Sequence, residues 1–376
     1  MAGHPRFPQC RSKRLSAPCP IPHGNIHSTW ICLAIFWGLG VAGCGNSDTG
    51  DTGSKQEPPS GLRAMTFNTG TTGGLAHDKP PDDGYTSLEA ALSDMYYGDG
   101  LAWRSVVDDT QAFLAELNGD PDTAIDVIAF QEIFYSGECV NVPDEAKPGF
   151  VCETWQPGDP SVAQLILGAG YRVACNIEKP DKCIAVRKDF AAIRGCDQDV
   201  CLDALAGARV PDCGGGSRVG RAVLDLADGG ELTVVLVHGS SGIEQKDQDC
   251  RVQQFQQVFE QLDPNIDAVK SPPAANGTRN LILGDLNTDP GRNYDFDESA
   301  AYFAAHADGT QFHFVTDVGP EATPTYGGLF NIDHIVSDYY GGSCVTAGVS
   351  EGVPGVTSTV YFDHKPVYCD LEAPTR

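Results

Sequence analysis

The stretch Asn280-Leu281-Ile282-Leu283-Gly284-Asp285-Leu286-Asn287 is a short apolar run that ends in Gly-Asp-Leu-Asn. An apolar run of this length between polar ends predicts a buried strand, because a helix needs more residues. Side chains alternate along a strand, so Asp285 and Asn287 leave its C-terminal end on the same face. The pair is either a turn after the strand, since Asp and Asn favour turns, or part of a site for phosphate or a metal-bound water.

Short apolar runs and helical patterns alternate around this stretch. The expected helices are 103–117, 161–167 and 247–262, and the expected strands are 62–67, 126–130, 171–175, 183–186, 221–226, 231–238, 281–283, 332–336, 360–362 and 366–369. The sequence Ala-Asp-Gly-Gly between 221–226 and 231–238 predicts a hairpin. Hairpins combined with covering helices favour a two-sheet α/β sandwich over an all-parallel, doubly wound sheet.

Residues 1–43 are predicted to be an export signal. Four basic residues precede the first acidic one, Asp48, and the apolar run of 12 residues at 30–41 suits a signal core but is too short to span a bilayer. The sequence Val41-Ala42-Gly43-Cys44 resembles a bacterial lipobox, and this resemblance implies cleavage before Cys44 and a lipid on its sulfur. Ordinary signal cleavage is the alternative.

Residues 44–61 consist of this cysteine and a segment dominated by Gly, Ser, Thr, Asp and Pro. Such a composition predicts a flexible tether between the anchor and one globular domain at 62–376. We therefore expect a monomer held by lipid in the bacterial cell envelope, at the outer membrane or cell surface, with its domain periplasmic or extracellular.

Cysteine usage supports export. Of the 14 cysteines, ten lie beyond Cys44: Cys139, Cys152, Cys175, Cys183, Cys196, Cys201, Cys213, Cys250, Cys344 and Cys369. An even number in an exported chain predicts disulfides, although their connectivity cannot be read from sequence. A zinc site has little support, because no C-x-x-C pair occurs.

The chain is strongly acidic, with a formal net charge of −26, and loss of the basic leader would make it more negative. Such a surface repels polyanions on average and argues against nonspecific binding of nucleic acid, which depends on Lys and Arg. A nuclease whose metal supplies local positive charge stays compatible with this composition.

Polar residues follow the strand-like runs at six places. They are Asn68, Glu132, His238, Asp285 with Asn287, Asp333, and Asp363 with His364. Each alone has a structural explanation, such as a turn, a helix cap or a buried histidine. Together they indicate a site, because catalytic residues gather on loops that a rigid scaffold positions.

The motifs that contain these residues form a recognisable set. They are Thr66-Phe67-Asn68, Phe130-Gln131-Glu132, Val237-His238, Gly284-Asp285-Leu286-Asn287, Ile332-Asp333-His334-Ile335 and Phe362-Asp363-His364-Lys365-Pro366-Val367. In this order they resemble the endonuclease/exonuclease/phosphatase superfamily, which includes deoxyribonuclease I-like nucleases, bacterial sphingomyelinases and inositol polyphosphate phosphatases. The resemblance implies a four-layer, two-sheet α/β sandwich.

The resemblance also implies a divalent cation. Glu132 would be its carboxylate ligand with Asn68 beside it, and Asp363 would add a second contact through water. Mg²⁺ suits such a set, because it uses one or two carboxylates and retains waters. Mn²⁺ and Ca²⁺ are alternatives.

The remaining motif residues would carry the hydrolysis. The resemblance implies that His364 is the general base, held by Asp333, and that Asp285 and Asn287 orient the attacking water and the phosphate. His238 would stabilise or protonate the other side of the phosphorus. A histidine oriented by a carboxylate activates water near neutral pH.

The substrate is the open question at this point. The expected activity is metal-dependent hydrolysis of a phosphodiester, of nuclease-like type. No Lys or Arg follows Gln131-Glu132, where the nuclease branch often has one, and Phe134 there either resembles the sphingomyelinase branch or packs in the core. The alternatives are therefore a lipid phosphodiesterase, an inositol-phosphate-type phosphatase and, from another class, a noncatalytic binding lipoprotein that keeps the fold.

Overall fold

The computed structural model describes residues 61–70, 100–120, 124–227, 229–263, 270–356 and 362–374. The export signal, Cys44 and nearly all of the tether lie outside these ranges, as do residues 71–99 and the first two residues of the expected strand 360–362. Among the described helices, none is both long enough and apolar enough to cross a bilayer.

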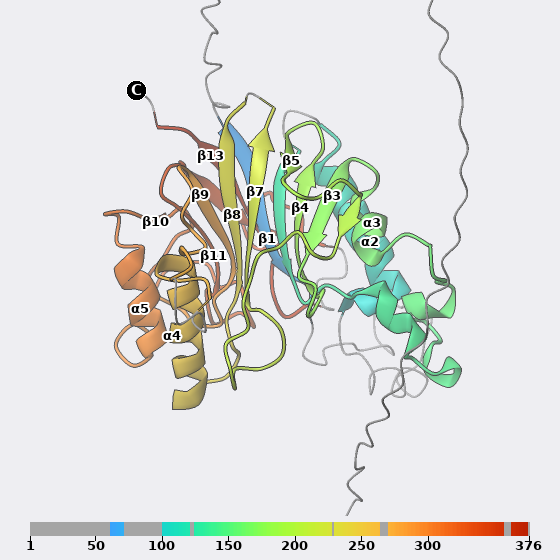
Figure 1. Ribbon diagram of the computed structural model, residues 1–376, viewed down its shortest axis with the longest axis horizontal. Coiled ribbons are helices and arrows are strands. Elements are labelled where there is room, and N and C mark those ends of the chain that lie inside the picture. Colours follow the sequence, from blue (N-terminus) through green and yellow to red (C-terminus); the bar gives the residue numbers. More distant parts are fainter. Residues whose placement is uncertain are drawn as a thin grey trace, which may run out of the picture. The chain divides into compact units, whose positions relative to one another are not determined.

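Two mixed sheets form the centre of the domain (Figure 1). The first has the order β12-β13-β1-β2-β4-β3-β6, with β1 Gly61–Asn68, β2 Val127–Gln131, β3 Tyr171–Cys175, β4 Lys182–Arg187, β6 Val200–Cys201, β12 Gly341–Thr346 and β13 Val367–Glu372. The second has the order β10-β11-β9-β8-β7-β5, with β5 Ala191–Ile193, β7 Val219–Leu226, β8 Glu231–His238, β9 Asn280–Asp285, β10 His313–Phe314 and β11 Asp333–Ser337.

Helices cover the outer faces of both sheets. The helices α2 Arg104–Leu117 and α3 Val162–Leu167 lie on the first sheet, together with the short 3₁₀ turns η1 Gly100–Ala102, η2 Ser136–Val140, η3 Asp144–Ala146 and η4 Val151–Glu153. The helices α4 Gln245–Phe259 and α5 Glu298–His306 lie on the second (Figure 1). This arrangement of helix, sheet, sheet and helix confirms the four-layer α/β sandwich.

An apolar core joins the inner faces of the sheets. Val127 of β2 lies in one buried cluster with Val234 of β8 and Leu283 of β9. The run 281–283 is therefore a buried strand, as expected. Phe134 is buried as well and packs in the apolar cluster of the first sheet.

Two parallel strand pairs decide where the polar residues go. β1 runs parallel to β2, and Asn68 pairs with Gln131 at their C-terminal ends. β8 runs parallel to β9, and His238 pairs with Asp285 in the same way. Asp333 begins β11 directly opposite Asp285. The register thus carries residues from five strands to one end of the sandwich.

All ten cysteines expected in disulfides are paired. The pairs are Cys139–Cys152, Cys175–Cys183, Cys196–Cys201, Cys213–Cys250 and Cys344–Cys369. Four of them bridge residues no more than 25 positions apart, whereas Cys213–Cys250 spans 37 and joins the long segment 194–218 to helix α4. Disulfides of this density are typical of exported domains.

Candidate active site

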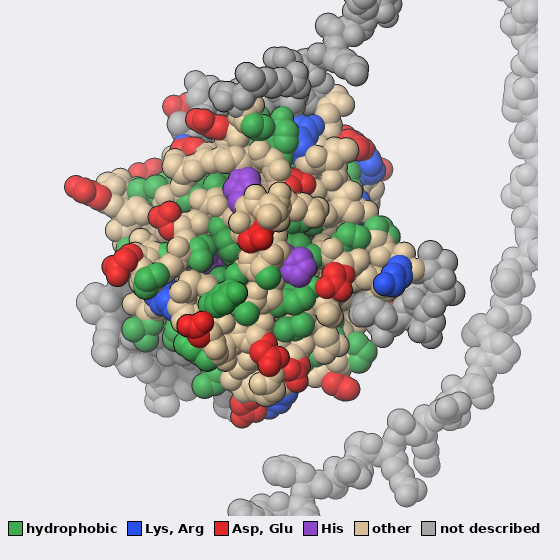
Figure 2. Space-filling view, turned by 90° about the vertical axis from the view of Figure 1, so that its left-hand side faces the viewer, with side chains coloured by type: hydrophobic (Ala, Val, Ile, Leu, Met, Phe, Trp, Pro, Cys, Tyr) green, Lys and Arg blue, Asp and Glu red, His purple; other side chains and the backbone are tan. Residues whose placement is uncertain are grey.

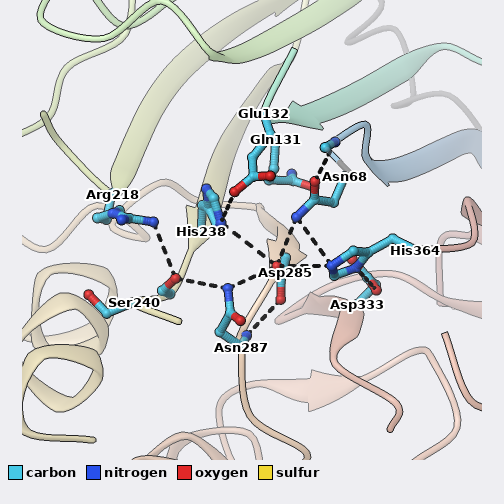
Figure 3. Close-up of polar contacts among 12 residues, drawn as sticks. Asn68, Gln131, Glu132, Arg218, His238, Ser240, Asp285, Asn287, Asp333 and His364 are labelled. Carbon is cyan, nitrogen blue, oxygen red and sulfur yellow. Dashed lines mark hydrogen bonds and ion pairs between the residues drawn. The ribbon is translucent and has the colours of Figure 1, made fainter. Parts of the chain in front are cut away.

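The carboxylate of Asp285 lies at the centre of the polar cluster (Figure 3). Its Oδ2 accepts hydrogen bonds from Nδ2 of Asn68 and Nδ2 of Asn287, each at 3.0 Å, and its Oδ1 accepts one from the backbone N–H of Asn287 at 2.7 Å. Asn287 adopts the left-handed conformation with φ 51°, which Asn tolerates better than most residues. Burial raises the pKa of Asp285 well above its usual range, against the opposing charge of His364.

His364 and Asp333 form a hydrogen-bonded pair beside this carboxylate. Nδ1 of His364 lies 2.8 Å from Oδ2 of Asp333, and both side chains are buried. The opposite ring nitrogen, Nε2, faces the site, 3.4 Å from Nδ2 of Asn68 and 3.7 Å from Oδ2 of Asp285. Burial lowers the pKa of His364, but the negative charges of Asp333 and Asp285 outweigh it and raise the pKa to about 10.

Glu132 and His238 form the other side of the cluster. Nε2 of His238 lies 3.5 Å from Oε1 of Glu132 and 3.8 Å from Oδ2 of Asp285. Glu132 has φ 56°, which is an unfavourable backbone conformation for this residue type. Strained conformations of this kind are most common at functional sites. A Cβ on Gly70 would lie 1.7 Å from Oε2 of Glu132, so a side chain at position 70 would displace this carboxylate from its present position.

Burial is the largest influence on the pKa values of Glu132 and His238. It raises the pKa of Glu132, while the charge of His364 acts in the opposite direction. It lowers the pKa of His238 well below the usual value, and the positive charges of Arg218 and Lys182 act in the same direction. His238 is therefore a neutral donor or acceptor at neutral pH.

The side chains present fit a hard divalent cation. Within the described part of the chain, Asp285, Asp333 and His364 form a group whose ligand atoms all lie within 4.8 Å of one another, and this group does not include the predicted ligands Asn68, Glu132 and Asp363. Oδ1 of Asp333 is buried without a hydrogen-bond partner there, and Glu132 presents a partly exposed carboxylate across the cluster. Oxygen-rich sets of this kind suit Mg²⁺, Mn²⁺ and Ca²⁺.

The structure brings together seven of the eight residues that the sequence assigned to the reaction. They are Asn68, Glu132, His238, Asp285, Asn287, Asp333 and His364. Asp363 precedes His364 in the chain, and its charge acts on both His364 and Glu132. No hydrogen bond or ion pair of its carboxylate is described, so its part in holding a metal stays a prediction.

Two neighbours of the site have no counterpart in the predicted motifs. The ring of Tyr326 packs on that of His364, with centroids 4.8 Å apart. Arg218 donates from Nη1 to the carbonyl of Gly239 at 3.4 Å, next to His238 (Figure 3). Both lie on loops, where no periodic pattern places a single side chain. The segment 188–219, with three cysteines and Gly214-Gly215-Gly216, is unusual in sequence, but this does not single out Arg218.

No protein-family model matches the chain, and no curated protein matches its sequence. Solved structures do match it. An endonuclease/exonuclease/phosphatase from Bacteroides vulgatus is 13% identical with a TM-score of 0.44, over 84% of this chain and 99% of that one. The AP endonuclease LMAP from Leishmania major is 15% identical with a TM-score of 0.43, over 86% and 91%, respectively.

Truncated TDP2 from Caenorhabditis elegans is 13% identical with a TM-score of 0.46, over 83% of this chain and 98% of that one. At these identities and TM-scores the likenesses do not assign an activity to this chain, and its chemistry follows from its own side chains.

Proposed function

We propose that this protein is a divalent-metal-dependent phosphodiester hydrolase, of nuclease-like type, carried on an exported lipoprotein. One observation supports the chemistry above all: the hydrogen bond between His364 and Asp333 orients Nε2 toward a cluster of carboxylates and amides. A buried carboxylate–histidine pair is the arrangement that activates water as a nucleophile. Amide donors and a cation site beside it suit a phosphoester, whose oxygens become more negative during the reaction.

In this proposal each side chain has a separate task. Nε2 of His364 takes the proton of the attacking water, and Asp333 fixes the ring through Nδ1. Asn287 positions a phosphoryl oxygen with the help of Asp285, and neutral His238 stabilises the opposite side. Glu132 and Asn68 would hold the divalent cation, which when bound neutralises charge on the phosphoryl oxygens. Added positive charge there also favours the neutral imidazole that a general base requires.

The replacement His364→Ala tests the role of the base. We expect it to lower the Mg²⁺-dependent hydrolysis of bis(p-nitrophenyl) phosphate at least about 100-fold, which is the size of a general-base contribution. EDTA should abolish the activity of the unsubstituted protein. His306→Ala, at the end of α5 and away from the cluster, is the matched control and should retain full activity. Unchanged turnover in His364→Ala would overturn the assignment.

The rival hypothesis is a binding lipoprotein without catalysis. It is weakened by the completeness of the site, since the base, its carboxylate partner and the amides are all in contact. If plasmid DNA, RNA, a phospholipid and an inositol polyphosphate all stay intact with Mg²⁺, Mn²⁺ or Ca²⁺ present, the binding hypothesis replaces the proposed one.

A further inference from the structure

Exposed apolar side chains are distributed unevenly between the two ends of the sandwich. We call the end that carries Asn68, His238 and Asp285 the catalytic end, and the end that carries Gly61 and Glu231 the opposite end. The large apolar side chains that are exposed in the described ranges number nine: Val140, Ile177, Ile243, Tyr294, Phe296, Val318, Leu329, Phe330 and Val349.

Each of the nine lies on a connection at the catalytic end. Val140 follows the end of β2, Ile177 lies between β3 and β4, and Ile243 follows β8. Tyr294 and Phe296 follow β9, Val318, Leu329 and Phe330 precede β11, and Val349 joins β12 to β13. Connections at the opposite end, as far as the structure describes them, expose no large apolar side chain.

One of these connections is fixed directly to the catalytic histidine. The turn at Tyr326–Phe330 is closed by hydrogen bonds between the backbones of Tyr326 and Phe330, at 2.9 and 3.2 Å. The N–H of Gly327 donates to the carbonyl of Asp363 at 3.0 Å, and the ring of Tyr326 packs on His364. Leu329, 69% exposed, therefore projects from the rim of the site on a braced turn.

A second connection is braced against the first. The carboxylate of Asp289 accepts from the backbone N–H of Asn331 at 2.9 Å, and Arg292 donates to the carbonyl of Pro320 at 3.0 Å. These contacts hold the loop that exposes Tyr294 and Phe296, the latter 71% exposed. Both loops leave the same end of the second sheet, so their apolar side chains form a pre-organised rim and not a set of scattered residues.

We propose that the catalytic end docks on a zwitterionic phospholipid surface, and that the phosphodiester it cleaves is a lipid headgroup ester in that surface. This inference rests on the proposed hydrolase function and names its substrate class. A phospholipid layer presents a phosphoester and an apolar surface together, which is what the site and its rim would meet. Mixed aromatic and aliphatic side chains on exposed loops suit the boundary between headgroups and acyl chains.

The charge of the chain selects the kind of lipid. With a net charge of −26, the protein is on average repelled by anionic membranes. Acidic side chains are also prominent on the face that carries α4 and α5 (Figure 2). Apolar burial is then the main attraction, at about 25 cal/mol per Å² of apolar area removed from water. On a zwitterionic surface the apolar side chains can be buried without electrostatic repulsion between the protein and the lipid.

A tryptophan placed on the rim measures docking without any need for catalysis. We expect the tryptophan of Phe296→Trp to be quenched by phosphatidylcholine vesicles with brominated acyl chains, and much less by phosphatidylserine vesicles. Thr310→Trp, on the exposed turn at the opposite end, is the matched control and should show no quenching beyond that of the parent chain. Both variants carry Cys44→Ser, so that no lipid anchor contributes.

Activity provides the second readout. The double replacement Phe296→Ser/Leu329→Ser should lower cleavage of vesicle phosphatidylcholine at least about tenfold, but leave hydrolysis of bis(p-nitrophenyl) phosphate unchanged, because neither side chain belongs to the catalytic cluster. If the parent chain does not hydrolyse bis(p-nitrophenyl) phosphate, the proposed hydrolase function is refuted, but docking on lipid is not. Absence of Phe296→Trp quenching, or equal quenching of Thr310→Trp, would refute the lipid surface and leave a protein partner as the occupant of the rim.

Discussion

Asp333 contributes to the site through a single hydrogen bond, and this makes its role testable by a change that keeps the shape of the side chain. Asp333→Asn retains the volume but removes the charge that holds Nδ1 of His364. In a serine-protease triad the equivalent change selects the wrong tautomer and costs about 10⁴-fold in turnover. We expect a loss of about 100-fold to 10⁴-fold here, with KM for bis(p-nitrophenyl) phosphate nearly unchanged.

A purely structural role for Asp333 predicts a different result. Asp333→Asn would then lower the free energy of unfolding and leave the turnover of the folded fraction intact. Because the negative charge of Asp333 is also one cause of the raised pKa of His364, the variant should lower this pKa. The imidazole titration followed by NMR separates the two roles, since loss of folding stability alone would not move it.

The residues of the site were predictable to the extent that strands fix them. Asp285 could be placed at the end of a buried strand, and the parallel pairing of β8 with β9 then brings His238 next to it. Asn287 reaches the same site through a left-handed turn after β9, and not by alternation along the strand. Tyr326 and Arg218 could not be found in this way. Their contacts with His364 and Gly239 depend on how long loops fold over the sheet ends, which leaves no periodic pattern in the sequence.

The helices α4 and α5 are joined by a buried ion pair that also supports the site. Nη2 of Arg251 lies 2.9 Å from Oδ2 of Asp297, and its Nη1 donates to the carbonyls of Ser240 and Gly242 at 2.8 Å. Ser240 follows His238 by two residues, so the pair fixes the loop behind that histidine. Asp297 in addition accepts from the backbone N–H of Ser299 at the N-terminus of α5.

Asp297→Asn removes the charge and preserves a good N-cap residue. Because it leaves Arg251 buried without its counter-ion, we expect the free energy of unfolding to fall by about 3–5 kcal/mol in urea titrations. Asp225→Asn breaks an exposed pair with Arg194 and should cost much less, because solvent screens an exposed ion pair. If both variants lose the same free energy of unfolding, burial does not make the Arg251–Asp297 pair more important for stability than the exposed pair.

The same pair gives a pH dependence. Burial raises the pKa of Asp297, but the hydrogen bonds of Ser299 and Thr288 and the charge of Arg251 outweigh it, and the pKa is lowered overall. A carboxylate with a lowered pKa stabilises the fold above its unfolded value of about 3.9, and this contribution is lost as the pH falls through the folded value. The stability difference between the parent and Asp297→Asn should therefore shrink below about pH 4.

Elements with a clear periodicity were predicted well, and those without it were missed. Helix α2 at Arg104–Leu117 and strand β8 at Glu231–His238 coincide closely with the expected 103–117 and 231–238. Helix α5 was missed because its Ala-rich sequence has little amphipathic contrast, although Asp297 supplies the N-cap. Strand β12 was missed because it begins Gly-Gly-Ser, and only its pairing with β13 defines it.

At the scale of the whole molecule, the catalytic end faces away from the start of the domain. β1 begins at Gly61, at the opposite end of the sandwich, and reaches the site only at Asn68. If Cys44 carries the proposed lipid, the intervening residues reach at most about 60 Å when fully extended. The anchor would then be joined to the domain at the end that lacks exposed large apolar side chains in the described ranges.

The disulfides stabilise this architecture to different extents, because they close loops of different length. Cys213–Cys250 spans 37 residues and Cys196–Cys201 spans five. Cross-links restrict the unfolded chain, so the chain-entropy relation assigns about 4 kcal/mol to the longer loop and about 2 kcal/mol to the shorter one. Their connectivity was not predictable, since the even number of cysteines is compatible with many pairings.

Paired replacements by serine test this difference. Cys213→Ser/Cys250→Ser should lower the free energy of unfolding by about 2 kcal/mol more than Cys196→Ser/Cys201→Ser, measured in urea under oxidising conditions. The longer bridge also ties the segment before Arg218 to helix α4, and Arg218 contacts the carbonyl of Gly239, next to His238 of the proposed active site. Its removal should therefore reduce turnover as well as stability. A larger loss from the short bridge would show that local native contacts, and not restriction of the unfolded chain, determine what each disulfide contributes.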